Sequence, residues 1–279
     1  MLLITLFLRI LSNPLANVLQ KELTKQYSTF FVNAITYGGL FILMLPFIFN
    51  LSLNPQILFY GLLGGLLGAL GNAFLIKALS IGDLSVLGPI NSYKPVVAMF
   101  LGIFILKELP SMFCVLAVLL IILGSYFIFD TIEEKFSFKL FLRKDIQYRF
   151  YALFLTAVEA LIIKQIIILS DIKTAFIFWC MFGFIFSVIF LFIRKEKISI
   201  LHKKSNLLFL FLILLFGLMQ ITTNYIFNNM NVSYALALFQ LSTIINVIFG
   251  YKFFKEKHIV RKLIGTIIMI IGATIIILD

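Results

Sequence analysis

The chain has 279 residues, of which 62% are hydrophobic and only 13% are charged. Soluble domains average about half apolar and about a quarter charged, so this composition excludes a water-soluble fold. The net charge of +11 does not indicate a nucleic-acid partner, because the basic residues cluster in short segments between apolar runs, as membrane orientation requires. The two cysteines, Cys114 and Cys180, lie within apolar runs and predict neither a disulfide nor a metal site.

Hydropathy divides the chain into apolar runs that are long enough to cross a bilayer as helices. They cover residues 2–20, 29–49, 56–80, 84–105, 110–129, 149–169, 172–193, 207–229, 233–253 and 260–278. Each must be helical, because only a helix satisfies its own backbone groups in lipid. The longest connection, residues 131–148, follows the fifth run. We therefore predict an all-α polytopic membrane protein with ten transmembrane helices, divided into a first five-helix domain (1–130) and a second (149–279).

The two halves of the chain resemble each other in sequence. The aligned pairs are Ser85 with Ser233, Gly102 with Gly250, Lys107-Glu108 with Lys255-Glu256, Ala117 with Gly265, Gly124 with Gly272, Thr29 with Thr174 and Gly38 with Gly183. A repeat with an odd number of spans starts its second copy from the opposite side of the membrane, so duplication predicts two inverted five-helix repeats. This architecture is typical of secondary transporters, which bind substrate near the midplane between the repeats.

Charged side chains inside the predicted helices cost about 3 kcal/mol or more at the bilayer centre and usually mark function. Lys94 and Glu159 lie near the middle of their runs and Arg9 lies at an intermediate depth. Lys77 and Lys164 lie near helix ends, from which they can reach the interface. Two interpretations of the deepest pair, Lys94 and Glu159, stay open. They form either a structural ion pair between the halves or a substrate or proton site.

The segment NSYKPVV, residues 91–97, places a helix-breaking residue directly after Lys94. Pro95 removes the amide donor that the carbonyl of Asn91 would use, and Pro89 acts in the same way further upstream. Freed carbonyls at bilayer depth must face a cavity or polar protein groups. We therefore predict a broken helix that presents a positive charge and spare acceptors to a polar cavity. A simple kink with a neutralised lysine is the alternative.

Polar side chains repeat every three or four residues on one face of several predicted helices. The three stripes are Arg9, Asn13, Asn17 and Gln20; Gln220, Asn224 and Asn228; and Gln240, Thr243 and Asn246. Asn72 and Asn91 are single polar residues in the third and fourth predicted helices. A polar stripe in lipid must face other helices, and interhelical hydrogen bonding explains any single amide equally well. We predict that these residues, except Gln20 and Asn228, line a substrate pathway together with Lys94 and Glu159.

Short motifs at equivalent places in the two halves resemble EamA-type transporters of the drug/metabolite transporter superfamily. They read GIFILKELP and GSYFIFD in the first half and GYKFFKEKH and GATIIILD in the second, with SNPLANVLQK near the start. The resemblance covers essentially the whole chain. It implies a carrier of the bacterial inner membrane with a cavity lined by the first, third, fourth, sixth, eighth and ninth spans. Lys94 departs from the family, which usually has an apolar or small residue before this proline.

Basic residues between the predicted helices lie mostly on one side of the membrane. In a ten-span arrangement only Lys107 and Lys173 fall on the opposite side. The positive-inside rule therefore places both termini outside. The family resemblance implies cytoplasmic termini instead. We favour external termini on the strength of the charge bias.

We expect a secondary transporter that moves a small metabolite, an amino acid or an organic anion, across the inner membrane by alternating access and in the direction of export. Its expected partners are the substrate, the bilayer and a coupling proton or ion, with no cofactor. A lipid or lipid-carrier flippase is the alternative, with Arg9 and Lys94 contacting a phosphate, and a non-transporting scaffold ranks third. An enzyme is disfavoured, because His202 and His258 lie outside the runs and no nucleophile motif occurs.

Overall fold

The computed structural model describes residues 1–279 except 50, 52–53, 95, 98–111, 132–137 and 279. Over this part of the chain the structure is all-helical. Its α-helices are α1 (Leu2–Leu23), α2 (Thr29–Met44), α3 (Pro55–Ile81), α4 (Leu84–Leu87), α6 (Met112–Phe129), α7 (Lys144–Leu169), α8 (Ile172–Ile193), α9 (Lys203–Asn229), α10 (Val232–Phe239), α11 (Leu241–Phe254) and α12 (Ile259–Leu278). Three 3-10 turns join them, η1 (Leu45–Phe47), η2 (Pro89–Tyr93) and η3 (Phe138–Leu142).

Seven helices within the described residues are long and apolar enough to cross a membrane. Val115–Phe129 is a shorter apolar helix. Large apolar side chains such as Phe7, Ile189 and Ile271 are exposed on the surface of the bundle. Because such extensive apolar exposure is unfavourable in water, these surfaces face lipid. The chain is therefore a multi-pass membrane protein. The predicted fourth span, 84–105, lies partly outside the described residues.

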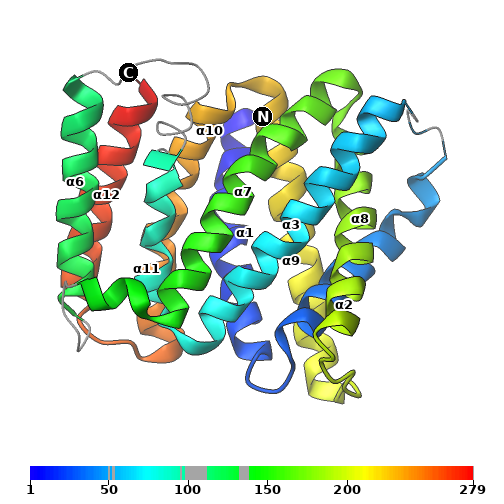
Figure 1. Ribbon diagram of the computed structural model, residues 1–279, viewed down its shortest axis with the longest axis horizontal. Helices are drawn as coiled ribbons and strands as arrows, with labels where there is room; N and C mark the ends of the chain where they lie inside the picture. The colour runs from blue at the N-terminus through cyan, green and yellow to red at the C-terminus, as the bar shows by residue number, and fades with distance from the viewer. Residues whose placement is uncertain (50, 52–53, 95, 98–111, 132–137, 279) are drawn as a thin grey trace.

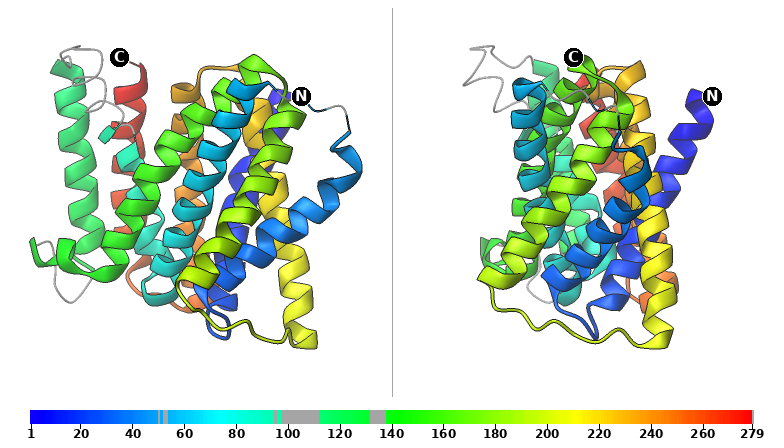
Figure 2. Two further views of the ribbon diagram at one scale, coloured as in Figure 1. Left: turned by 45° about the vertical axis from the view of Figure 1, so that its right-hand side comes forward. Right: turned by 90° about the vertical axis from the view of Figure 1, so that its right-hand side faces the viewer.

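The helices of the two halves pack against each other and do not form separate bodies. α3 packs along α7, α1 along α9, α2 on α8 and α6 on α12. Figure 1 shows α6 and α12 side by side at one edge of the bundle, and Figure 2 shows the same pair from a second direction. The N- and C-terminal ends of the chain lie at the same end of the bundle in these views.

Small residues let α6 and α12 approach closely. A Cβ on Gly124 would lie 2.5 Å from the carbonyl oxygen of Gly265, and a Cβ on Gly272 would lie 2.6 Å from that of Ala117. Small side chains at such crossings are typical of helices packed in membranes. The sequence comparison pairs Gly124 with Gly272 and Ala117 with Gly265, so each of the two contacts joins a residue of one pair to a residue of the other.

The connections at the end of the bundle opposite the termini are strongly basic. The segments 24–28, 194–202 and 255–258 lie at this end in Figure 1. They carry Lys25, Arg194, Lys195, Lys197, Lys255 and Lys257. Below, this part of the bundle is called the basic end.

Two basic residues near the starts of predicted helices are buried inside the bundle. Arg149 is buried in α7 and Lys262 is buried in α12. Each has a polar partner inside the bundle, because Arg149 donates to the carbonyl of Leu87 and Lys262 donates to the hydroxyl of Ser85. These partners offset part of the cost of removing the charges from water.

Candidate functional site

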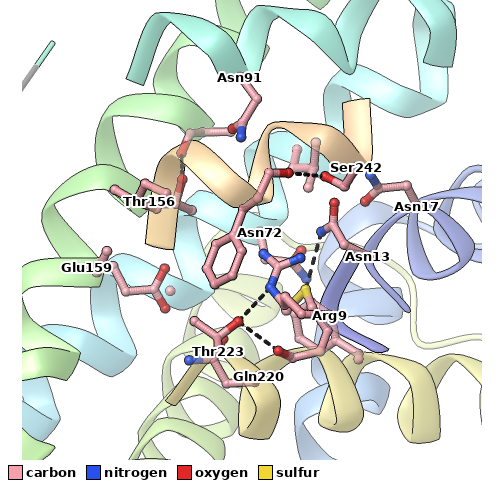
Figure 3. Close-up of a pocket in the computed structure, with 18 of the residues that line it drawn as sticks. Arg9, Asn13, Asn17, Asn72, Asn91, Thr156, Glu159, Gln220, Thr223 and Ser242 are labelled. Carbon is pink, nitrogen blue, oxygen red and sulfur yellow. Dashed lines mark hydrogen bonds between the residues drawn. The ribbon is translucent and has the colours of Figure 1, made fainter. Parts of the chain in front are cut away.

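The polar faces of the helices converge on a cavity within the bundle, shown in Figure 3. Its volume is about 130 Å³. α1, α3, α7, α9, α10, α11 and the segment 88–94 line it, together with Tyr37 of α2 and Trp179 of α8. The other polar and charged lining residues are Arg9, Asn13, Asn17, Asn72, Asn91, Lys94, Arg149, Thr156, Glu159, Gln220, Thr223, Ser242, Thr243 and Asn246.

Nearly all residues of the predicted substrate pathway lie in this wall. The two exceptions are Asn224 and Gln240, which are buried behind it. Asn224 accepts a hydrogen bond from Gln220 at 3.0 Å, and Gln240 accepts one from Asn91 at 3.2 Å. Both therefore support lining residues without facing the cavity. Of the two predicted helix-breaking prolines, Pro89 is described and Pro95 lies outside the described residues.

Arg9 is held at the cavity by two contacts from the second half of the chain. Its Nε donates to the hydroxyl of Thr223 at 2.6 Å, and its guanidinium carbon lies 4.4 Å from the ring centroid of Phe239. Such a cation–π contact stabilises a charge that is partly withdrawn from water. The terminal Nη1 of Arg9 is buried and has no hydrogen-bond partner in the described structure. The arginine is thus fixed in position while one of its donors stays available.

The helix that contains Asn91 changes geometry at the cavity. α4 ends at Leu87, and η2 begins at Pro89, where the amide of Asn91 donates to Gly88 at 3.1 Å. The carbonyl of Leu87 accepts instead from Nε of Arg149 at 2.8 Å, and Nη2 of the same guanidinium donates to Asn91 at 3.0 Å. An arginine from the second half therefore satisfies a carbonyl that the irregular backbone leaves free.

A second interruption lies at the equivalent level of the other half. α10 ends at Phe239 and α11 begins at Leu241, so Gln240 separates two helices without any proline. The side-chain amide of Gln240 donates to the carbonyl of Leu236 at 3.0 Å. Because Asn91 donates to Gln240, the two interrupted segments touch each other beside the cavity.

The two deepest charges of the sequence, Lys94 and Glu159, both line the cavity but form no ion pair with each other in the described structure. Glu159 accepts a hydrogen bond from the indole nitrogen of Trp179 at 2.6 Å. Lys94 donates to none of the described residues, although it lies close enough to Arg149, Glu159 and Arg9 to interact with them electrostatically. The structural ion pair, one of the two interpretations that the sequence left open, is therefore not formed between these described residues, and Lys94 lines the cavity.

Interhelical amide bonds account for part of the polar stripes. Asn17 donates to Asn246 at 3.1 Å, and Asn72 accepts from Gln20 at 3.1 Å. Asn72 also donates to Asn33 at 2.7 Å. The two interpretations of these stripes therefore apply together, because Asn17, Asn72 and Asn246 join helices and line the cavity as well.

Among the polar and charged residues of the wall, sequence reasoning missed Tyr37, Arg149, Thr156, Trp179, Thr223 and Ser242. Arg149, Thr156 and Glu159 recur at helical spacing on one face of α7, and this pattern could have revealed the first two. Thr223 lies three residues after Gln220, so the same helical spacing could have predicted that it faces the cavity. The aromatic residues gave no signal, because an aromatic side chain in an apolar run is equally compatible with lipid or with the core.

A second polar cluster joins the halves at the basic end. The carboxylate of Glu256 accepts hydrogen bonds at 2.8 Å from the backbone amides of Leu84 and Ser85, and another from the Ser85 hydroxyl. It also forms an ion pair with Lys21 at 3.2 Å. Burial alone would raise the pKa of Glu256, but Lys21 and the hydrogen bonds from Ser85 and Leu84 outweigh it, so the pKa lies below its ordinary value. Gly250 leaves the room that this carboxylate needs.

Comparison with known proteins gives the family. Residues 2–130 and 146–278 match the EamA-like transporter family. The chain belongs to this family. The match confirms the resemblance drawn from the sequence motifs, and it places the chain among membrane transporters and not among enzymes. No curated protein matches the chain. The chain is also similar to a protein of known crystal structure, and the alignment covers 98% of this chain and 94% of that protein. The sequence identity is 14% and the TM-score is 0.70, which shows a shared fold.

Proposed function

We propose that this EamA-like protein is a secondary transporter that carries a small metabolite, an organic anion or an amino acid, across the bacterial inner membrane by alternating access and in the direction of export. The observation that carries the proposal is the cavity, where three cations and a carboxylate from both halves face one space inside a multi-pass membrane protein. Ionisable groups within the bilayer are costly and typically line substrate or ion pathways.

We infer that the chain forms ten spans in two inverted repeats, residues 1–130 and 149–279, joined by residues 131–148. The reciprocal contacts between α6 and α12 support this arrangement. The helix pairing supports it too, because α3 with α7 and α9 with α1 are equivalent pairs under the repeat. The interruptions support it as well, because Gln240 aligns with Ser92 of η2 under the same shift that pairs Gly124 with Gly272. Transporters of this kind place substrate where discontinuous helices meet.

Alternating access follows from the same elements. The interruptions at 88–94 and at Gln240 let the outer parts of these helices tilt while the cavity keeps its lining. At the basic end Glu256 fastens α4 to the loop after α11 and to α1, and so keeps the halves together there. Release of this cluster opens the basic end. Glu159 is the acidic side chain that could take up a coupling proton at the cavity.

Transport by the purified protein tests the proposal. Small metabolites inside and outside cells that carry or lack the protein identify candidate substrates, and exchange of each labelled candidate is then measured in proteoliposomes. We expect exchange that saturates and that Glu159→Ala abolishes without loss of folded protein. If exchange depends on a lipid-linked sugar and on no small solute, the chain is a flippase. If neither class is moved, the transporter assignment of this cavity is wrong.

A further inference from the structure

The charges around the cavity do not balance. Arg9, Lys94 and Arg149 bring three positive charges, and Glu159 brings one negative charge. No other acidic side chain lines the cavity among the described residues. An excess of two positive charges inside a bilayer is costly unless a partner compensates for it. The cavity therefore favours a ligand that carries two negative charges.

Two of these cations keep hydrogen-bond donors for a ligand. Arg9 uses Nε for Thr223, but its buried Nη1 has no partner. Lys94 donates to none of the described residues. Buried donors are almost always paired in native structures, so donors that no protein group engages beside a cavity are positioned to bind an acceptor group of a ligand. Arg149 differs, because it already donates to Leu87 and Asn91 and holds the interrupted helix.

The remaining lining suits a small molecule with hydroxyl groups. Amides and hydroxyls from four helices, among them Asn13, Thr156, Gln220 and Ser242, face the same space as the charges. Glu159 already accepts a hydrogen bond from Trp179 and interacts electrostatically with Lys94, so it does not need a cationic group of the ligand as a partner. A cavity volume of about 130 Å³ is compatible with a ligand of a few carbon atoms.

We propose that the substrate is a small organic dianion, a dicarboxylate or a phosphate monoester, bound between Arg9 and Lys94. This inference rests on the proposed transport function and adds the chemical class of the substrate. Charge-assisted hydrogen bonds from both cations would hold the anionic groups, because ionised donors bind carboxylate and phosphate most strongly.

The single tryptophan of the chain provides the measurement. Trp179 lines the cavity and contacts Glu159, so its fluorescence reports directly on ligand binding. The purified protein is titrated with succinate, malate and glycerol 3-phosphate as dianions, with propionate as a monoanion and with alanine as a zwitterion. We expect a saturable change with dianions at concentrations about tenfold or more below those needed for propionate or alanine, since each charge-assisted contact is worth that much. Comparison of succinate with glycerol 3-phosphate shows whether the site prefers a dicarboxylate or a phosphate monoester.

Variants connect the signal to the two cations. Arg9→Gln and Lys94→Met should each weaken dianion binding about tenfold or more. Lys77→Met removes the same charge from an exposed position outside the cavity and should leave binding unchanged. If Arg9→Gln fails to fold, Arg9→Lys keeps the charge and should bind dianions more tightly than propionate. Equal binding of both ligands by a folded Arg9→Lys protein contradicts the proposal.

Glu159→Gln separates a dianion from an amino acid. Removal of the carboxylate takes away a group that repels a dianion, so dianion binding should be retained or strengthened. An amino acid would place its ammonium group beside Glu159, and its binding would fall about tenfold or more. Loss of dianion binding in the folded variant contradicts the proposal.

The outcomes also separate this inference from the transport proposal. Binding of propionate or alanine as tightly as any dianion overturns the dianion class, and so does a complete lack of response to all three dianions. Exchange of a monoanion or a zwitterion in proteoliposomes overturns the dianion class and leaves the transport function in place. Binding of dianions without exchange of any solute overturns the transport function and leaves the dianion class in place.

Discussion

Gly68 determines where the carboxylate of Glu159 can lie. A Cβ at this position would overlap Oε1 of Glu159 and would lie 3.0 Å from the indole nitrogen of Trp179. Gly68→Ala should therefore displace the carboxylate and break its hydrogen bond to Trp179. We expect transport to fall about tenfold while the fold survives, because alanine favours a helix over glycine by about 1 kcal/mol. Exchange in proteoliposomes and the melting temperature measure the two effects.

Gly64→Ala is the matched control for this variant. Gly64 lies one turn before Gly68 on α3. A Cβ at Gly64 would lie 3.3 Å from Ile162 and would meet no polar group of the cavity. It should keep transport close to that of the unmodified protein. Equal losses of transport in Gly64→Ala and Gly68→Ala would mean that helix packing, and not the position of Glu159, is affected.

Individual cavity residues were predictable where their chemistry conflicts with their surroundings. Lys94 and Glu159 stand out because a charge in an apolar run needs a reason to be there. Arg149 was missed because it lies near the start of a run, where an arginine is equally compatible with a loop. Trp179 was not predictable at all, because its role depends on the distant position of Glu159 across two helices.

At the scale of elements, Arg149 stabilises the interruption between α4 and η2. Arg149→Lys keeps the charge but removes the forked contact with Leu87 and Asn91, which an ammonium group cannot reproduce. We expect the free energy of unfolding to fall by about 1–3 kcal/mol, because a buried carbonyl loses its partner. Thermal unfolding in detergent measures this change.

Arg261→Lys provides the comparison for Arg149→Lys. Arg261 contacts Asp130 at 2.7 Å on the exposed surface, and such pairs contribute about 0–1 kcal/mol. Its replacement should change stability little. If the Arg149 and Arg261 variants unfold at the same temperature, the contact to the Leu87 carbonyl does not stabilise the interrupted helix.

The helix interruptions were predictable only in one half. Pro89 indicates an irregular helix because proline cannot donate a backbone hydrogen bond. The interruption at Gln240 has no proline, and its signal lies in packing, because Gln240 bonds to Leu236 and to Asn91 of the other half. The polar faces of α1 and α9 were readable from their spacing, since side chains four residues apart share a helix face.

The cluster at the basic end predicts a pH-dependent stability. The pKa of Glu256 lies below its ordinary value in the folded protein, so its contribution is present above the ordinary carboxyl pKa and is lost as pH falls through the folded value. Glu256→Gln should therefore lower the melting temperature at pH 7, and its difference from the unmodified protein should shrink towards pH 4 and below. Melting curves across this pH range give the measurement.

Glu22→Gln is the control for the pH experiment. Glu22 pairs with Lys25 at 2.6 Å, but both side chains are exposed, so screening by solvent keeps the contribution small. Its melting temperature should follow that of the unmodified protein at every pH. A constant difference between Glu256→Gln and the unmodified protein from pH 7 to pH 3 would show that the charge of Glu256 is not what stabilises the cluster.

At the scale of the whole molecule, composition was sufficient to predict a helical membrane protein, and short motifs were sufficient for its family. The pairing of α3 with α7 and of α1 with α9 was beyond sequence reasoning, because hydropathy describes each helix alone and not its neighbours. The correspondence of Gly124 with Gly272 acquires a physical meaning only in the structure, where both glycines lie at the contact between α6 and α12.

The charge distribution predicts the orientation of the molecule in its membrane. The basic end carries the loops 24–28, 194–202 and 255–258, and the ends of the chain lie at the opposite side. Cytoplasmic loops carry the excess of lysine and arginine, so the basic end should face the cytoplasm. A reporter enzyme that is active only in the periplasm should therefore be active when fused after residue 279 and inactive when inserted in 194–202. The opposite pattern would show that the charge bias does not orient this protein. In the predicted orientation the contacts of Glu256 with Leu84, Ser85 and Lys21 join the two halves at the cytoplasmic side.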